Sequence, residues 1–164
     1  MANYGYDEKD CIFCKISRKE INPLGNGLIY EDEEFMAWLS PYPNTLGFSV
    51  VTTKKHYPSD VLKLDDDVLS RFVIASKKVA KLLEDYFDDV GRVGLIMEGT
   101  GINHAHIKFF PMHGTGYMKK GEWKQHSSSF DKYFKKYEGY IASNDSQKTD
   151  LEELELLAKK IKKN

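Results

Sequence analysis

Residues 104–110 read His-Ala-His-Ile-Lys-Phe-Phe, and this stretch decides the fold that the sequence predicts. Because successive side chains of a strand point to opposite faces, a strand here places His104, His106 and Lys108 on one face and the intervening apolar residues on the other. A single histidine on a half-exposed strand is more often an ordinary surface group. Two histidines with a lysine, directly after a Gly-containing turn, instead favour a functional site.

The segments around this stretch predict a sheet of short strands. Apolar or β-branched runs separated by acidic, Pro-rich or Gly-containing connections predict strands at residues 28–31, 35–39, 46–53, 93–97 and 104–110. The first three are close in sequence and resemble an antiparallel meander. The turn before the last strand is the compact segment at residues 98–103.

Two longer segments have the spacing of amphipathic helices. The first follows Asp65-Asp66-Asp67, with apolar residues at helical intervals as far as Phe87, and predicts a long central helix whose apolar stripe packs on the sheet. The second begins at Thr149-Asp150-Leu151-Glu152, which has the form of a capping box. A shorter helical stretch is expected near residues 130–137. The predicted fold class is therefore α+β, with an antiparallel sheet, one long central helix and a C-terminal helix.

The length and composition fit one domain. The chain has 164 residues, of which 41% are hydrophobic and 13% aromatic, and this is enough to bury one core without disulfides. We expect a single domain over residues 1–164. Its core spans about 11–111, and residues 112–164 form an irregular aromatic segment followed by the C-terminal helix.

The charge balance argues against several classes of protein. The net charge is only -1, so the chain lacks the basic surface of a general nucleic-acid binder. The polar, partly acidic first ten residues do not form a secretory signal, and no apolar run is long enough to span a bilayer. We therefore expect a cytoplasmic protein without a nucleic-acid or membrane partner.

Both cysteines fall in one Cys-x-x-Cys motif, Cys11 and Cys14. Three interpretations remain: a metal clip, a redox pair and two inert buried thiols. A redox pair usually follows a strand in a βαβ unit, and no strand precedes this motif. A tetrahedral zinc site would need two further ligands, and the histidines available are His56, His104, His113 and His126.

The motif at residues 104–110 resembles the signature of the histidine-triad family, His-apolar-His-apolar-His followed by two apolar residues. The resemblance extends from Cys11 to about Pro111. It includes Cys-x-x-Cys-Lys-Ile at the start, Pro-x-x-x-Gly at residues 43–47, the strand ending in Thr-Lys-Lys-His at residues 53–56 and the long helix. It is closest to the zinc-bearing branch, which includes Hint proteins and diadenosine polyphosphate hydrolases.

This resemblance implies an enzyme that acts on nucleotides. The middle histidine of the family is the nucleophile, which assigns that role to His106. The implied activity is that of a nucleotide hydrolase or nucleotidyl transferase, which forms a covalent nucleotidyl-His106 intermediate at the α-phosphorus of a nucleoside phosphoramidate or dinucleoside polyphosphate. The resemblance further implies a homodimer, and a structural zinc ion held by Cys11, Cys14, His56 and His104.

The sequence departs from the family pattern at several positions. Lys108 stands in place of the third histidine, where its charge is expected to lower the pKa of His106 and to attract phosphate oxygens. Ser40 stands where many members have an Asp that binds ribose hydroxyls. Gly101 and Asn103 are the nearest substitutes in the phosphate-facing loop. These changes leave two alternatives open, a catalytically weak nucleotide-binding module and a zinc-stabilised interaction domain.

Overall fold

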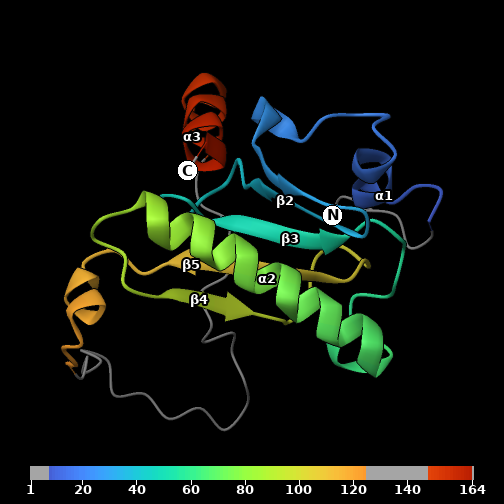
Figure 1. Cartoon of the computed structure of the whole chain (residues 1–164). Coiled ribbons are helices and arrows are strands. Elements are labelled where there is room, and N and C mark those ends of the chain that lie inside the picture. Colours follow the sequence, from blue (N-terminus) through green and yellow to red (C-terminus); the bar gives the residue numbers. More distant parts are fainter. Residues whose placement is uncertain (1–7, 125–147, 164) are drawn as a thin grey trace, which may run out of the picture.

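The computed structural model describes residues 8–124 and 148–163. Its centre is a five-stranded antiparallel sheet in the order β1-β2-β3-β5-β4 (Figure 1). The strands are β1 (Leu28–Glu31), β2 (Phe35–Leu39), β3 (Ser49–Thr53), β4 (Val93–Ile96) and β5 (His106–Pro111). The described residues form the helices α1 (Ile12–Ser17), α2 (Asp66–Tyr86) and α3 (Leu151–Lys163), and short 3-10 turns occur at Leu24–Asn26, Val61–Lys63 and Gly116–Lys120. The α+β class predicted from the sequence is confirmed.

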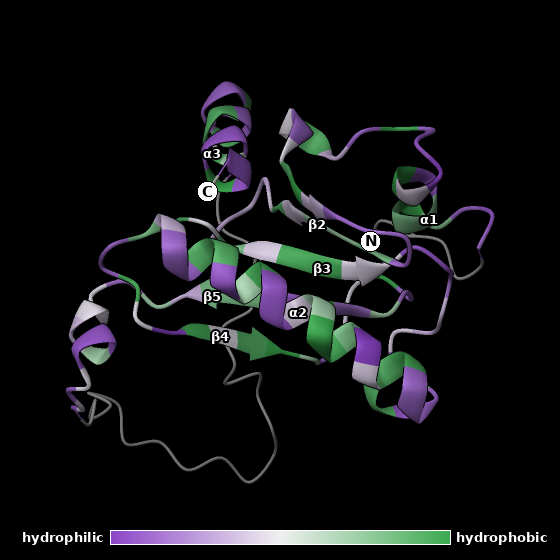
Figure 2. Cartoon of the chain, viewed as in Figure 1, coloured by the Kyte–Doolittle hydropathy of each residue, from purple (hydrophilic) through white to green (hydrophobic). Residues whose placement is uncertain are grey.

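Helix α2 lies across one face of the sheet and forms the main core there (Figure 1). Hydropathy alternates along this helix, as Figure 2 shows, because its apolar residues recur at helical spacing. Phe72 is fully buried and stacks on Phe35 of β2, with ring centroids 5.2 Å apart. Burial of each such side chain stabilises the fold by about 1.5–3 kcal/mol, so this face supplies most of the hydrophobic stabilisation.

The opposite face of the sheet is covered in part by α1. Phe13 and Ile16 of this short helix pack with Met36, Trp38 and Val50 in a second, smaller apolar cluster. Successive side chains of β2 point to opposite faces of the sheet, so its even-numbered residues face α1 and its odd-numbered residues face α2. The sheet therefore separates two apolar cores.

Helix α3 packs beside β1 and the turn at Leu24–Asn26. Its buried residues are Leu154, Ala158 and Ile161, at helical spacing. The predicted capping box is wrong by one residue. Asp150, rather than Thr149, caps the helix, because its carboxylate accepts hydrogen bonds from the backbone N–H groups of the second and third helical residues at 2.9 and 3.0 Å.

The element boundaries match the prediction closely, except next to turns. The strand predicted at 46–53 begins only at Ser49, because Gly47 has a φ of +81° and belongs to a turn. The strand predicted at 104–110 runs from His106 to Pro111, since the backbone N–H of Ala105 bonds instead to the carbonyl of Tyr57. The helix expected near residues 130–137 lies outside the described residues.

Within residues 8–124 and 148–163, no helix combines the length and the apolar character needed to cross a bilayer.

Candidate metal site and active site

Four side chains that are distant in sequence converge beside α1. Cys11 and Cys14 come from the start of this helix, His56 follows β3, and His104 precedes β5. One ligand atom from each of the four lies within 4.8 Å of all the others. The sequence-based proposal of these residues as one set therefore agrees with their placement.

The separations suit a zinc ion. The Sγ of Cys14 lies 3.3 Å from Nδ1 of His56 and 3.4 Å from Nδ1 of His104, and the Sγ of Cys11 lies 3.3 Å from the same His104 nitrogen. Zinc–sulfur and zinc–nitrogen bonds of about 2.3 and 2.1 Å in a tetrahedron give sulfur–nitrogen edges of about 3.5 Å. Two thiols and two imidazoles thus fit this metal in both spacing and chemistry.

His104 is oriented for such a role by its second ring nitrogen. Its Nε2 lies 2.7 Å from the carbonyl oxygen of Thr53, which places the proton on Nε2 and leaves the lone pair of Nδ1 facing the thiols. Burial of the ring lowers the pKa of His104 to about 4, so this imidazole is neutral near pH 7. A neutral imidazole is the form that binds metal.

The thiol of Cys14 needs a cation to ionise. Burial, together with a hydrogen bond in which its S–H donates to Cys11, raises the pKa of Cys14 to about 12. Metal binding therefore requires the release of thiol protons, and the affinity of the site increases with pH.

His106 lies next to this cluster and has a defined tautomer. Its Nδ1 lies 2.6 Å from the carbonyl oxygen of His104, an acceptor that requires a proton on Nδ1. The lone pair is therefore on Nε2, the nitrogen available for attack on an electrophile. Burial is the largest cause that lowers the pKa of His106, and the charge of Lys108 lowers it further, so the ring is neutral.

An aromatic side chain that the sequence analysis did not single out covers both histidines. The ring of Phe13 makes edge contacts with His104 and His106, with centroids 5.7 and 5.6 Å away, and with Trp38 at 5.1 Å. Its position between the two cysteines was the available signal. His106 is only 3% exposed, and Phe13 is one of the side chains that contact it.

Lys108 lies two residues after His106 on the same face of β5, as predicted, but it has a partner that the sequence analysis missed. Its ammonium forms an ion pair with the carboxylate of Glu98, which lies in the turn after β4. Both side chains are mostly buried, with exposed fractions of 18% and 15%. An acidic residue directly after a strand, beside a Gly-containing turn, was the signal that could have indicated it.

Ser40 lies along the sheet from His106, not next to it. Met36 of β2 pairs with Thr52 of β3, which in turn pairs with His106 of β5. Ser40 stands four positions after Met36, so it is offset from His106 by roughly 13 Å along the strands. Its Oγ accepts a hydrogen bond from the backbone N–H of Tyr42 at 3.2 Å.

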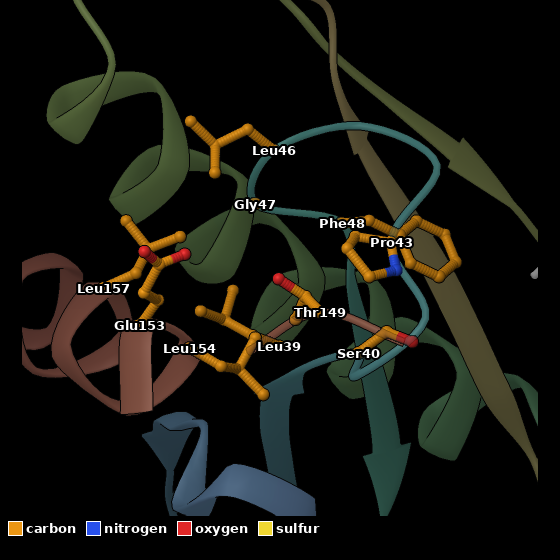
Figure 3. Close-up of a pocket in the computed structure, with 10 residues that line it drawn as sticks. All are labelled: Leu39, Ser40, Pro43, Leu46, Gly47, Phe48, Thr149, Glu153, Leu154 and Leu157. Atoms are coloured by element: carbon orange, nitrogen blue, oxygen red, sulfur yellow. The ribbon is translucent and has the colours of Figure 1, made fainter. Parts of the chain in front are cut away.

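Ser40 also lines a pocket of about 140 Å³ between the β2–β3 connection and α3, which Figure 3 shows. This volume is below the range of about 300–1,000 Å³ typical of small-molecule sites. The pocket is lined by Leu39, Ser40, Pro43, Leu46, Gly47, Phe48, Thr149, Glu153, Leu154 and Leu157.

The turn that precedes β5 contains the other two candidates. Gly101 has a φ of +90°, and a Cβ built there would meet no atom within 4 Å, so the backbone at this point borders open space. The side-chain oxygen of Asn103 accepts a hydrogen bond from the backbone N–H of Ser59 at 3.0 Å. Asn103 therefore ties the turn to the segment after His56.

Two further aromatic groups pack against residues outside the site. His113 lies 3.1 Å from the carboxylate of Asp89 and 2.9 Å from the carbonyl oxygen of Leu46. Trp123 is largely exposed and lies against Arg92, with 5.0 Å between the guanidinium carbon and the ring centroid. His126 lies outside the described residues.

Comparison with known proteins identifies the family. No family model matches the chain. An uncharacterized HIT-like protein of Methanocaldococcus jannaschii is 35% identical over 120 residues, which cover 70% of this chain and 89% of that protein. The chain belongs to the HIT family. The HIT protein named hit in Bacillus subtilis is 29% identical over 126 residues, covering 74% of this chain and 84% of its own length.

Solved HIT structures have the same fold. A hypothetical histidine triad nucleotide-binding protein of Sulfolobus tokodaii superposes with a TM-score of 0.65 at 26% identity, covering 93% of this chain and 90% of that one. A HIT-like protein of Bartonella henselae has a TM-score of 0.64 at 22% identity, with 93% of both chains covered. The five-stranded sheet with its helices is thus the HIT fold.

Proposed function

We propose that this HIT protein is a nucleotide hydrolase or nucleotidyl transferase in which His106 attacks an α-phosphorus. The observation that carries the proposal is the hydrogen bond from Nδ1 of His106 to the carbonyl oxygen of His104, which leaves a neutral Nε2 as the nucleophile. The description of the Sulfolobus tokodaii relative as nucleotide-binding supports the substrate class.

The reaction divides one displacement into two steps. In the first, the Nε2 lone pair of His106 forms a bond to phosphorus while the bond to the leaving group breaks, and the leaving group takes that electron pair. An amine leaving group then takes a proton from solvent. In the second step water, or another acceptor, attacks the nucleotidyl-His106 and the phosphorus–nitrogen bond breaks. Nucleoside phosphoramidates and dinucleoside polyphosphates provide such a phosphorus atom.

We assign the phosphate contacts to Lys108, Gly101 and Asn103. The ammonium of Lys108 lies on the face of β5 that carries His106, where a cation can hold the charge that develops on the phosphoryl oxygens. The open backbone at Gly101 admits a phosphate group close to the turn. Ser40 is offset from His106 by roughly 13 Å along the strands, so we do not assign it a ribose contact.

The zinc ion is proposed as a structural group. Cys11, Cys14, His56 and His104 would occupy all four positions of a tetrahedral site, which leaves none for a substrate. The ion would hold α1 against the sheet and fix His104, whose carbonyl oxygen in turn orients His106.

A homodimer is also proposed, and the edge of the sheet supports it. Among the described residues, strand β4 pairs with β5 alone, and its Leu95 is 43% exposed. An exposed apolar edge strand is a ready surface for a second copy. The sedimentation velocity of the purified chain tests this proposal.

The decisive experiment traps the covalent intermediate. Wild-type protein is mixed with an adenosine 5′-phosphoramidate of a fluorescent amine and quenched in base, and intact mass should increase by one adenylate. His106→Ala should lose both the adduct and several decades of rate but still fold and bind AMP. Turnover by His106→Ala at the wild-type rate would refute the assignment. If AMP binds without turnover of any substrate, the chain is instead a nucleotide-binding module.

A further inference from the structure

A carboxylate lies beside the proposed nucleophile on the same face of the sheet. The β4–β5 ladder ends with Ile96 paired to Lys108, and Glu98 follows two residues later in the turn, where its carboxylate pairs with Lys108 and its negative charge raises the pKa of His106. The ion pair between Glu98 and Lys108 supports this placement, because Lys108 and His106 alternate onto the same side of β5.

The two halves of the proposed reaction differ in their need for a base. The neutral imidazole of His106 has no proton on Nε2, so its attack on phosphorus needs no proton acceptor. Water must lose a proton when it attacks the nucleotidyl-histidine, and a base within reach of that water accelerates the step. The second half therefore calls for a group that the first half does not use.

Glu98 is the carboxylate in position for this task. Its side chain is mostly buried, so it is shielded from bulk solvent, and its partner Lys108 fixes its direction along the sheet face. A carboxylate offers about four lone-pair positions, and it can therefore accept hydrogen bonds from an ammonium and from a water molecule at once. The other titratable neighbours of His106 in residues 8–124 and 148–163 are His104, whose ring faces the thiols, and Lys108, which is a cation.

We propose that Glu98 is the general base of the hydrolytic half-reaction, an inference that rests on the proposed function. A carboxylate oxygen of Glu98 takes a proton from water while the water oxygen forms a bond to phosphorus. The phosphorus–nitrogen bond breaks, its electron pair returns to Nε2 of His106, and a nucleoside monophosphate leaves. The proton on Glu98 then passes to solvent. Lys108 acts in both halves by holding the phosphoryl oxygens.

The test separates the two half-reactions with one substitution in each partner of the ion pair. The adenosine phosphoramidate of a fluorescent amine is mixed rapidly with Glu98→Gln, and both amine release and adenylated protein are followed. We expect a burst of amine close to the wild-type burst, accumulation of the adduct, and steady-state turnover lower by roughly a hundredfold or more. Lys108→Met, the matched control, should instead slow the burst itself.

Rescue by an added nucleophile separates a missing base from a disturbed site. Hydroxylamine is already a strong nucleophile when neutral, so it should discharge the adduct of Glu98→Gln and restore turnover. Glu98→Asp, which keeps the carboxylate on a side chain one methylene shorter, should discharge the adduct faster than Gln. If Glu98→Gln folds poorly, Glu98→Asp is compared with the wild type instead. An adduct of Glu98→Asp that is discharged at the same rate with and without hydroxylamine contradicts the proposal.

Two other results would overturn it. If Glu98→Gln lowers the burst and the steady state together, as Lys108→Met does, then Glu98 only positions Lys108. If the adduct fails to accumulate although the burst is normal, then another group activates the water. Absence of any adduct in the wild type is a different failure, because it removes the proposed function of His106 itself.

Discussion

Removal of the metal should destabilise this protein measurably. The proposed ligands join the start of α1 to the segments that flank β3 and β5, and Cys14 is central because its sulfur contacts the Nδ1 atoms of both His56 and His104. Zinc that binds only the folded chain at a free concentration of 1,000 times its dissociation constant adds about 4 kcal/mol to the free energy of unfolding.

For a chain of this size, each kcal/mol shifts the melting temperature by about 2–4 °C, so chelation should lower it by roughly 8–16 °C. The assay is differential scanning fluorimetry or calorimetry of the zinc-loaded and chelated protein, with the zinc content measured in parallel. Cys14→Ser should melt at the temperature of the chelated wild type, whether or not chelator is present.

Lys15→Ser is the matched control, because Lys15 lies on the same helix with a part-exposed side chain and is not one of the four ligands. It should bind zinc as the wild type does. A chelated wild type or Cys14→Ser that melts at the zinc-loaded temperature would show that the site contributes nothing to the fold. A protein purified without zinc that gains no stability from added zinc would contradict the ligand assignment as well.

Three further predictions concern single positions. Lys108→Ala should reduce turnover of the fluorescent phosphoramidate by roughly ten- to a thousandfold, because one fixed charge beside the phosphoryl group is lost, and Lys108→His should retain more activity. Gly47→Ala should lower the urea midpoint of unfolding more than Gly114→Ala. Both glycines have φ near +80°, but only at Gly47 would the new Cβ meet a ring atom 2.7 Å away. The pKa of Asp89 is lowered by its hydrogen bond from a histidine, so its contribution to stability is present above about pH 4 and is lost as the pH falls through the folded-state pKa. Asp89→Asn should therefore have a lower urea midpoint of unfolding than the wild type at pH 7, and this difference in midpoint should shrink by pH 3.

The sequence predicted best the elements whose pattern is local. Strands β1 and β2 begin and end where the apolar runs do, and α2 follows its helical periodicity. The four proposed metal ligands came from the family resemblance, and the structure brings them together. The beginning of β3 was missed because Gly47 has a left-handed backbone and leaves no room for a side chain beside Phe87, neither of which pattern reasoning represents.

The side-chain contacts of the site depend on the register between strands, and this explains why the sequence analysis missed the ion pair of Lys108 with Glu98. The pairing of Lys108 with Glu98 follows from the alignment of β4 with β5, and nothing in either strand alone specifies that alignment. The direction of His106 likewise comes from a backbone carbonyl. Residue types can indicate which groups take part, whereas hydrogen bonds to the backbone decide which atom of each group is available.

The division of the chain into two cores by one sheet has a consequence for how the molecule opens. The α1 side contains few apolar residues, and this six-residue helix has no side-chain cap at its first turn. The α2 side holds most of the buried apolar residues. In the chelated protein, which lacks the proposed zinc link from Cys11 and Cys14 to the sheet, residues 11–17 should therefore form a cooperative unit of low stability that detaches while the rest of the sheet stays folded. Amide protons of α1 would then exchange long before those of α2, and each such opening would expose His106 to water without unfolding the protein.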